Sequence, residues 1–148
     1  MITLRTPEPS DKAAWTELWT AYLAFYNTER GPDVFEWTWN QIHDPSPDMQ
    51  ARIALERDRP IGLVHFLYHN SFWEPEKRCY LNDLYTVPDA RGSGAGRAMI
   101  KAVYADAKER SASRVYWLTH EDNATARRLY DRIGKVTPFI KYMGTDVS

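Results

Sequence analysis

Apolar residues recur at three- and four-residue steps near the N-terminus, which predicts an amphipathic helix there. The stripe consists of Trp15, Leu18, Trp19, Tyr22, Phe25 and Tyr26. A short strand over Ile2–Arg5 is expected before this helix, with Ser10 or Asp11 as its cap. A second helix is expected over Val34–Ile42, after the break at Gly31-Pro32.

The middle of the chain is rich in branched and aromatic residues, which favour strands. Ala51–Glu56 and Ile61–His69 are expected to pair as a hairpin around Asp58-Arg59-Pro60. A further strand is expected over Cys79–Val87, and a proline-rich loop over 44–48 separates the helices from the hairpin.

Helical and strand patterns alternate in the last third of the chain. One helix ends near Ser111, and its buried face is marked by Met99, Ala102, Val103 and Ala107. A strand over Val115–Thr119, a helix from Asn123 to Gly134 and a final strand over Phe139–Met143 follow. The order β-α-α-β-β-β-α-β-α-β predicts an α/β fold with a mixed central sheet flanked by helices.

Composition narrows the class of protein. The 148 residues suit one domain, 1–148, with a proper core. Charges nearly cancel, 19 basic against 20 acidic, so no nucleic-acid partner is expected. The single cysteine, Cys79, excludes an internal disulfide and a thiolate metal cluster. Apolar runs are shorter than the roughly 20 residues that span a bilayer, and the N-terminus does not read as a signal peptide, so we expect a cytoplasmic protein with no membrane partner.

A glycine-rich loop follows the Cys79–Val87 strand and opens the next helix. Gly92, Gly94 and Gly96 allow backbone angles closed to other residues, so successive N–H groups can point at one anion. The helix N-terminus adds a partial positive charge, which favours phosphate. A Walker loop needs Lys-Ser or Lys-Thr after its last glycine, where this chain has Arg97-Ala98, and the glycine spacing also differs from a dinucleotide fingerprint.

The spacing of Arg91, Gly94 and Gly96 resembles the pyrophosphate-binding motif of the GNAT superfamily of N-acetyltransferases. The element order and the segment from Asn123 to Gly134 are also similar to that family. The resemblance implies a GNAT-like acyl-CoA N-acyltransferase fold, acetyl-CoA as cosubstrate and no metal. It implies a cofactor site made of Leu84, Tyr85, Thr86, Val87, Arg91, Gly92, Ser93, Gly94, Ala95, Gly96, Arg97, Asn123, Ala126 and Tyr130.

The same resemblance implies direct attack of a primary amine on the thioester. The N–H of Tyr85 or a neighbour is the candidate that polarises the thioester carbonyl. Tyr130 is expected to reach the sulfur mainly by hydrogen bonding, because proton donation from a group of pKa about 10 to a thiol near 8.5 is uphill by roughly 2 kcal/mol. Asn123, two helical turns or about 10 Å from Tyr130 on the same face, is expected to bind the pantetheine arm or simply to cap the helix.

The general base is less defined by the sequence. Asn82 stands where many relatives have a glutamate, so Asp83 is the remaining carboxylate. An aspartate of ordinary pKa is a poor direct base, so Asp83 is expected to act through a water or to bind the substrate ammonium. His120 and Glu121 are alternatives. A metal pair of His65 and His69 is discarded, because two strand residues at that spacing lie about 13 Å apart.

The run from Tyr116 to Glu121, followed by Asn123 to Tyr130, is similar to a group of small GNAT enzymes that act on polyamines, histone-type lysines or free amino acids. The near-neutral charge disfavours a very basic protein partner, so the acceptor is expected to be a small amine, such as a polyamine or an amino acid. An aromatic wall from the N-terminal helices would attract its cationic form. The expected substrate-binding residues are Tyr26, Trp37, Trp73, Asp83 and His120. An aromatic stripe at helical spacing is more often core, and surplus exposed aromatics would equally suit a homodimer surface. A protein lysine or N-terminal acetyltransferase and a non-catalytic acyl-CoA sensor are the alternatives.

Overall fold

The computed structural model describes residues 1–44 and 48–147, which fall into two compact units, Met1–Leu118 and Thr119–Ser148. The expected loop over 44–48 lies mostly outside the described residues, at 45–47. Among the residues described, every helix is too short or too polar to cross a bilayer.

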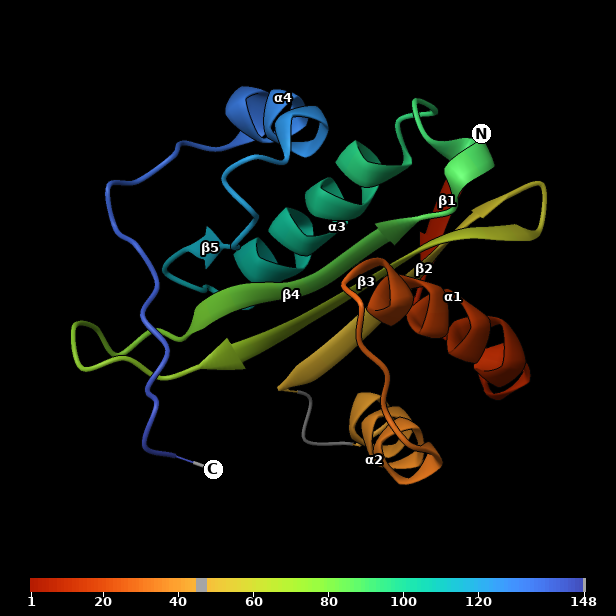
Figure 1. The fold of residues 1–148 in the computed structure, drawn as a ribbon, viewed down its shortest axis with the longest axis horizontal. Coiled ribbons are helices and arrows are strands. Elements are labelled where there is room, and N and C mark those ends of the chain that lie inside the picture. Colours follow the sequence, from red (N-terminus) through yellow and green to blue (C-terminus); the bar gives the residue numbers. More distant parts are fainter. Residues whose placement is uncertain (45–47, 148) are drawn as a thin grey trace. The chain divides into compact units, whose positions relative to one another are not determined.

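The first unit is built on a mixed sheet, as the sequence predicts, and this sheet has five strands (Figure 1). The strands are β1 (Ile2–Arg5), β2 (Met49–Glu56), β3 (Arg59–His69), β4 (Arg78–Thr86) and β5 (Val115–Tyr116), in that spatial order. Neighbours from β1 to β4 are antiparallel, whereas β4 and β5 are parallel. The predicted hairpin of the second and third strands is confirmed.

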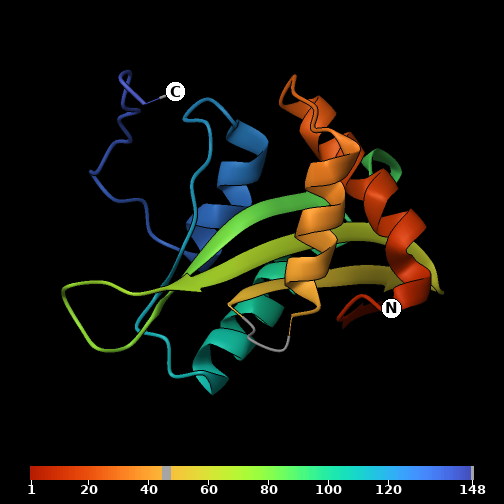
Figure 2. The same cartoon turned by 90° about the horizontal axis from the view of Figure 1, so that it is seen from below.

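Helices cover both faces of this sheet. Figures 1 and 2 show α1 (Lys12–Phe25) and α2 (Pro32–Ile42) on one face and α3 (Ala95–Glu109) on the other. The α1 stripe is mostly core, with Trp15, Leu18, Trp19 and Leu23 buried against α2 and the sheet. Phe25 and Tyr26, at the end of the stripe, are exposed.

The expected cap of α1 takes a different role. Asp11 directly precedes α1, but its carboxylate accepts the Glu8 N–H at 2.7 Å and pairs with the Arg5 guanidinium. These contacts close the short 3₁₀ turn Pro9–Asp11 and tie it to β1, and they hold the pKa of Asp11 below its ordinary value.

A β-bulge interrupts the pairing of β3 with β4. His65 lies opposite Asp83 and Phe66 lies opposite Leu81, so Asn82 is an extra residue in β4. Strand side chains alternate between the two faces of a sheet, and one extra residue reverses that alternation. The side chains of β4 after Asn82 therefore lie on the faces opposite to those that strict alternation from Arg78 would give them.

Contacts on each side of the bulge confirm this reversal. Before it, the Cys79 thiol meets Tyr68, whose hydroxyl donates to Asp106 of α3. After it, Asp83 bonds His65, which also bonds Trp15 of α1. Without the bulge Cys79 and Asp83 would share the α3 face. The extra residue therefore turns the carboxylate toward α1 and α2.

One edge of β4 is open over most of its length. β5 pairs with β4 only at Cys79↔Val115 and Tyr80↔Tyr116, and it ends three residues earlier than the expected Val115–Thr119. Within the described residues of the first unit, β4 continues from Leu81 to Thr86 with a strand partner on the β3 side alone. Backbone groups on its other side are available to a ligand.

The second unit contains α4 (Ala124–Ile133) and an extended tail. Asn123 caps α4, its amide oxygen accepting the Ala126 N–H at 3.3 Å, and Gly134 follows the last turn, as predicted. The expected final strand over Phe139–Met143 is wrong, because this segment has no regular secondary structure. Aromatic and branched residues form a strand only with a ladder partner, which the described part of the chain does not provide here.

Candidate active site

The glycine loop before α3 adopts the left-handed backbone that the sequence predicts at two positions. Gly92 has φ 82° and Gly94 has φ 90°. A Cβ at either residue would meet nothing within 4 Å, so the backbone conformation, not crowding, requires glycine. Gly96 was expected to contribute in the same way, but it is the second residue of α3 and is not left-handed.

The start of α3 carries backbone donors beside this loop that no helical hydrogen bond uses. The first helical bond runs from the Ala98 N–H to the Gly94 carbonyl at 3.0 Å. The N–H groups of Ala95, Gly96 and Arg97 precede that bond, and the helix dipole gives them partial positive charge. Arg91 adds a full charge, with its guanidinium 5.9 Å from the Phe25 ring centroid. These donors suit a diphosphate group.

The open edge of β4 supplies a second set of backbone donors. The Val87 N–H bonds the Ile61 carbonyl of β3 at 2.9 Å. Because backbone groups alternate in direction along a strand, the Tyr85 N–H also faces β3. Of the candidates, Tyr85 or a neighbour, the neighbours are therefore the ones with donors at the open edge, since the N–H groups of Leu84 and Thr86 face it.

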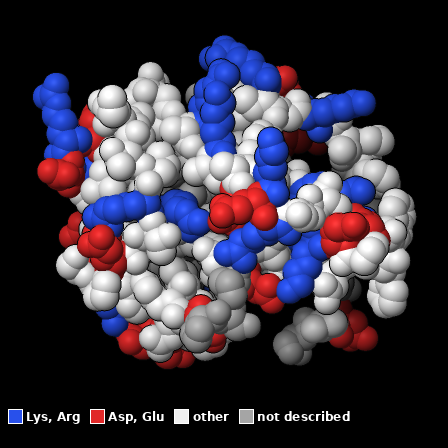
Figure 3. Space-filling model, turned by 180° about the vertical axis from the view of Figure 1, so that it is seen from behind, with Lys and Arg blue, Asp and Glu red and all other residues white. Residues whose placement is uncertain are grey.

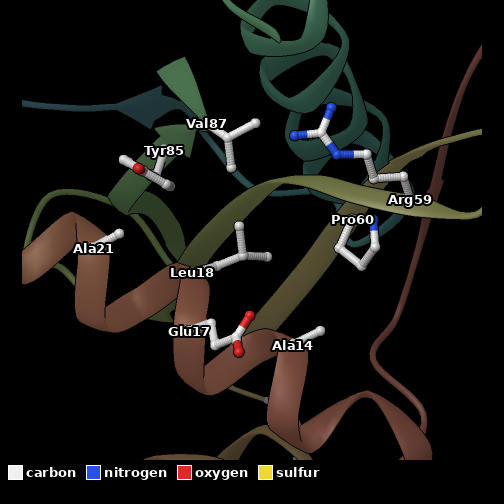
Figure 4. Close-up of a pocket in the computed structure, with 8 residues that line it drawn as sticks. All are labelled: Ala14, Glu17, Leu18, Ala21, Arg59, Pro60, Tyr85 and Val87. Atoms are coloured by element: carbon white, nitrogen blue, oxygen red, sulfur yellow. The ribbon is translucent and has the colours of Figure 1, made fainter. Parts of the chain in front are cut away.

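Tyr85 and Val87 instead direct their side chains toward α1. There they line a pocket of about 390 Å³, together with residues of α1 and the start of β3 (Figure 4). The other lining residues are Ala14, Glu17, Leu18, Ala21, Arg59 and Pro60. Four residues of α1 form one wall of it, two of them alanines, and Arg59 is already paired with Asp89 at 2.9 Å.

Asp83 lies at the end of a buried hydrogen-bond chain. The Trp15 indole N–H donates to Nε2 of His65 at 2.9 Å, and Nδ1 of His65 meets Oδ2 of Asp83 at 2.8 Å. An indole nitrogen can only donate, so Nε2 carries no proton and the ring donates from Nδ1. His65 is therefore held as the neutral tautomer that donates to the carboxylate.

Further donors keep Asp83 ionised. Asn82 donates to Oδ1 at 2.7 Å, and the Tyr22 hydroxyl also bonds the carboxylate. Burial alone would raise the pKa of Asp83, but the hydrogen bonds from His65, Asn82 and Tyr22 outweigh it and hold the pKa below its ordinary value. A strongly ionised carboxylate attracts a cation better than it accepts a proton.

A second pocket, of about 230 Å³, opens between α2 and the sheet beside this carboxylate. It brings together Trp37 and Asp83, two of the expected substrate-binding residues. The full lining is Trp19, Arg30, Val34, Trp37, Thr38, Ile42, Met49, Gln50, His65, Phe66, Leu67, Asn82 and Asp83. We call it the acceptor pocket. It combines apolar walls with one carboxylate and one guanidinium.

The other expected substrate residues lie elsewhere. Trp73 is 82% exposed on the β3–β4 hairpin and stacks near Arg78, at 5.5 Å. Arg78 is five residues, or roughly 17 Å, from Asp83 along β4, so the long hairpin carries Trp73 past the end of the sheet. Tyr26 does not line the pocket, although burial and then the charge of Asp83 raise its pKa. His120 belongs to the second unit.

The second unit positions Asn123, Ala126 and Tyr130 on α4. The cap uses the amide oxygen of Asn123, so its amide N–H₂ is the group that remains for a ligand. Within the described residues, no group of three or more His, Cys, Asp or Glu side chains is placed to hold a metal ion.

Comparison with models of known protein families identifies the family of this chain. The Acetyltransferase (GNAT) family matches residues 12–134. The chain belongs to the GNAT acetyltransferase family. It is 34% identical to D-amino-acid N-acetyltransferase HPA3 of Saccharomyces cerevisiae over 143 residues, covering 95% of this chain and 89% of that protein. It is 31% identical to the uncharacterized N-acetyltransferase YhfO of Bacillus subtilis, covering 95% of both.

Solved structures share the GNAT fold. The structure of AAC(6')-Iy with the bisubstrate analog CoA-S-monomethyl-acetylneamine superposes with a TM-score of 0.84, at 12% identity and over 99% of both chains. As a GNAT N-acetyltransferase, the protein is an acyltransferase that uses acetyl-CoA as cosubstrate. The donors of the glycine loop and of α3 are the groups in this chain that fit the diphosphate of that cosubstrate.

Sequence reasoning missed several residues of the acceptor pocket and of the hydrogen-bond chain beside it. His65 was considered only as a metal ligand, and Arg30 and Trp15 were not considered as polar partners. A buried histidine inside an apolar strand needs a hydrogen-bond partner, so the run around His65 did carry a signal. That partner depends on the β3–β4 register, which the unforeseen bulge shifts by one residue.

Proposed function

We propose that this GNAT enzyme transfers the acetyl group of acetyl-CoA to the primary amine of a small molecule bound in the acceptor pocket. The observation that carries the proposal is the ionised Asp83 carboxylate in the wall of that pocket. A pocket of about 230 Å³ suits an acceptor of amino-acid or polyamine size and excludes a folded protein surface. Basic and acidic side chains are interspersed on the face shown in Figure 3, which gives a polybasic partner no continuous acidic surface there.

The chemistry is a direct transfer in a ternary complex. Acetyl-CoA supplies an acetyl thioester. The amine lone pair forms the new N–C bond, the C–S bond breaks, and the sulfur leaves with the electron pair. The nitrogen proton passes to a water held by Asp83, because an amine of pKa about 10.4 is neutral in only roughly one molecule in 2,500 at pH 7.

Other residues of the chain stabilise the charges that develop. The N–H groups of Leu84 and Thr86 donate to the carbonyl oxygen as it gains negative charge. Tyr130 donates a hydrogen bond to the departing sulfur, and Asn123 binds the pantetheine arm. We also propose that both units act as one domain over 1–148, since the family model spans residues 12–134 of both. A cytoplasmic location stays a prediction.

Release of free CoA tests this proposal. Purified protein is given acetyl-CoA with a panel of polyamines, amino acids and a lysine-rich peptide, with Tyr130→Phe alongside. The panel includes D and L enantiomers, because the yeast relative is named for D-amino acids. We expect turnover on one small-amine class and a loss of kcat of at least tenfold in Tyr130→Phe.

A second tyrosine of the same unit provides the control. Tyr142 is exposed in the tail, so Tyr142→Phe is expected to keep kcat within about twofold. Turnover on the peptide alone would assign a protein acetyltransferase instead. Binding of acetyl-CoA with no CoA release on any amine would assign a sensor.

A further inference from the structure

We propose that Arg30 binds the carboxylate of the acceptor, so that the acceptor pocket selects a free amino acid over a polyamine. The amino group would lie at Asp83 and the carboxylate at Arg30. This inference rests on the proposed function, and it assigns that function a substrate class and a specificity-determining residue.

The charges of the acceptor pocket favour the binding of a zwitterionic acceptor. Arg30 and Asp83 are the two lining residues that carry a full charge, and their signs are opposite, since His65 is held neutral. An amino acid at neutral pH carries the same two charges on one small molecule. A polyamine carries only positive charges, so Arg30 would repel it while Asp83 attracted it.

The guanidinium of Arg30 is held in a position from which it can bind a carboxylate. It lies in the segment between α1 and α2, where Nη1 donates to Thr28 Oγ1 at 2.9 Å and to the Glu29 carbonyl at 2.8 Å. These two bonds hold one nitrogen of the guanidinium, and Nε and Nη2 remain as donors. A planar guanidinium binds a carboxylate through two such parallel bonds.

Most other arginines of the first unit already have a carboxylate partner. Arg5, Arg52, Arg59, Arg78, Arg110 and Arg114 each pair with an aspartate or glutamate. Arg30 has no carboxylate partner within the described residues, although it lines a pocket. An arginine held by its own segment and facing a pocket is available for an anionic ligand.

Trp19 gives a separate indication that the acceptor pocket binds a ligand with a hydrogen-bond acceptor. Its indole N–H is buried and has no hydrogen-bond partner among the described residues, and Trp19 also lines the acceptor pocket. A buried donor without an acceptor costs about 1–3 kcal/mol and is unusual away from ligand sites. A carboxylate in the pocket would bring an acceptor oxygen to this wall. The remaining walls, with Val34, Trp37 and Leu67, suit an apolar side chain.

The test compares one amino acid with its own amide, which keeps the amine but lacks the carboxylate charge. Leucine and leucinamide, each as both enantiomers, are assayed with wild type, Arg30→Gln and Arg30→Lys. We expect Arg30→Gln to raise KM for leucine at least tenfold and to change KM for leucinamide by less than about twofold. Arg30→Lys should recover part of the loss, because the charge returns without the planar fork.

Lys101→Gln serves as the matched control, because it removes one exposed positive charge on α3, outside the pocket. It is expected to leave both substrates within about twofold of wild type. Equal losses on leucine and leucinamide in Arg30→Gln, or no loss on leucine, would overturn the inference.

Failure of the proposed function has a different signature. If the wild type acetylates leucinamide or polyamines but no amino acid, the inference is overturned. The proposed function is then still supported. If wild type acetylates nothing, leucine is titrated against the intrinsic fluorescence of the six tryptophans, of which Trp19 and Trp37 line the pocket. A saturable change that Arg30→Gln weakens at least tenfold supports the site, and no change in wild type overturns it.

Discussion

Asp83 keeps its negative charge inside a largely buried wall because three neighbours donate hydrogen bonds to it. His65 is the central one, since it connects the carboxylate to Trp15 of α1. The network therefore joins a charge in the wall of the acceptor pocket to the core that supports it. At the scale of single residues, the proposed function makes acceptor binding depend on the same contacts as stability.

Replacing His65 with leucine tests that dependence. His65→Leu leaves the Trp15 N–H without an acceptor and removes one donor from Asp83, so the free energy of unfolding at pH 7 should fall by about 2–4 kcal/mol. Urea denaturation measures it. His69→Ala on the same strand is the control, and its smaller loss of about 1 kcal/mol or less follows from the more exposed position of His69.

The pH dependence of the same variant has a definite sign. The pKa of Asp83 lies below its ordinary value in the folded protein, so its stabilisation is fully present above the unfolded pKa of about 4 and is lost as the pH falls through the folded pKa. Removing the His65 donor raises that pKa, so acid unfolding of His65→Leu should begin at a higher pH. An unchanged acid midpoint would contradict this account of Asp83.

The bulge in β4 is the corresponding feature at the scale of an element. A single extra residue, Asn82, decides which face of the sheet receives Asp83. The bulge is an insertion of only one residue in the sequence. In the structure it moves the Asp83 side chain from the α3 face of the sheet to the acceptor pocket. The position of Asn82 in the strand therefore matters more than its side chain.

Deleting Asn82 should consequently do more harm than replacing it. Deletion would return Asp83 to the α3 face, so we expect kcat/KM to fall at least a hundredfold. Asn82→Ala keeps the extra residue and loses one hydrogen bond to Asp83, so its loss should stay within about tenfold. Acetyl-CoA binding and circular dichroism establish that the deletion variant is folded, and a folded deletion variant of near-wild-type activity would refute the role of the bulge.

The exposed apolar tail belongs to the scale of the whole molecule. Phe139, Ile140, Tyr142 and Met143 are each more than 70% exposed. We predict that this segment is covered in a homodimer, because contiguous exposed apolar residues mark association surfaces. Light scattering after size exclusion should give twice 17.2 kDa for wild type. Phe139→Ser with Ile140→Ser should give the monomer mass, Lys141→Ser should not, and a monomeric wild type would refute the prediction.

Local signals in the sequence predicted the parts of the molecule that local physics determines. The α1 stripe, the left-handed Gly92 and Gly94, and the Asn123 cap each depend on neighbours within a few residues. The His65–Asp83 pair and the bulge depend on strand register, and the tail depends on a ladder partner. These features are set by distant parts of the chain, which is why only Trp37 and Asp83 of the expected substrate-binding residues line the acceptor pocket.

The open edge of β4 has a consequence for how such an enzyme can change over generations. In the proposed mechanism the groups that face the thioester there are main-chain N–H groups of Leu84 and Thr86, which almost any amino acid would supply. The acceptor pocket, in contrast, is made of side chains such as Arg30 and Trp37. Mutations can therefore exchange one acceptor for another while the acetyl-transferring edge is inherited unaltered, so the substrate can diverge much faster than the reaction.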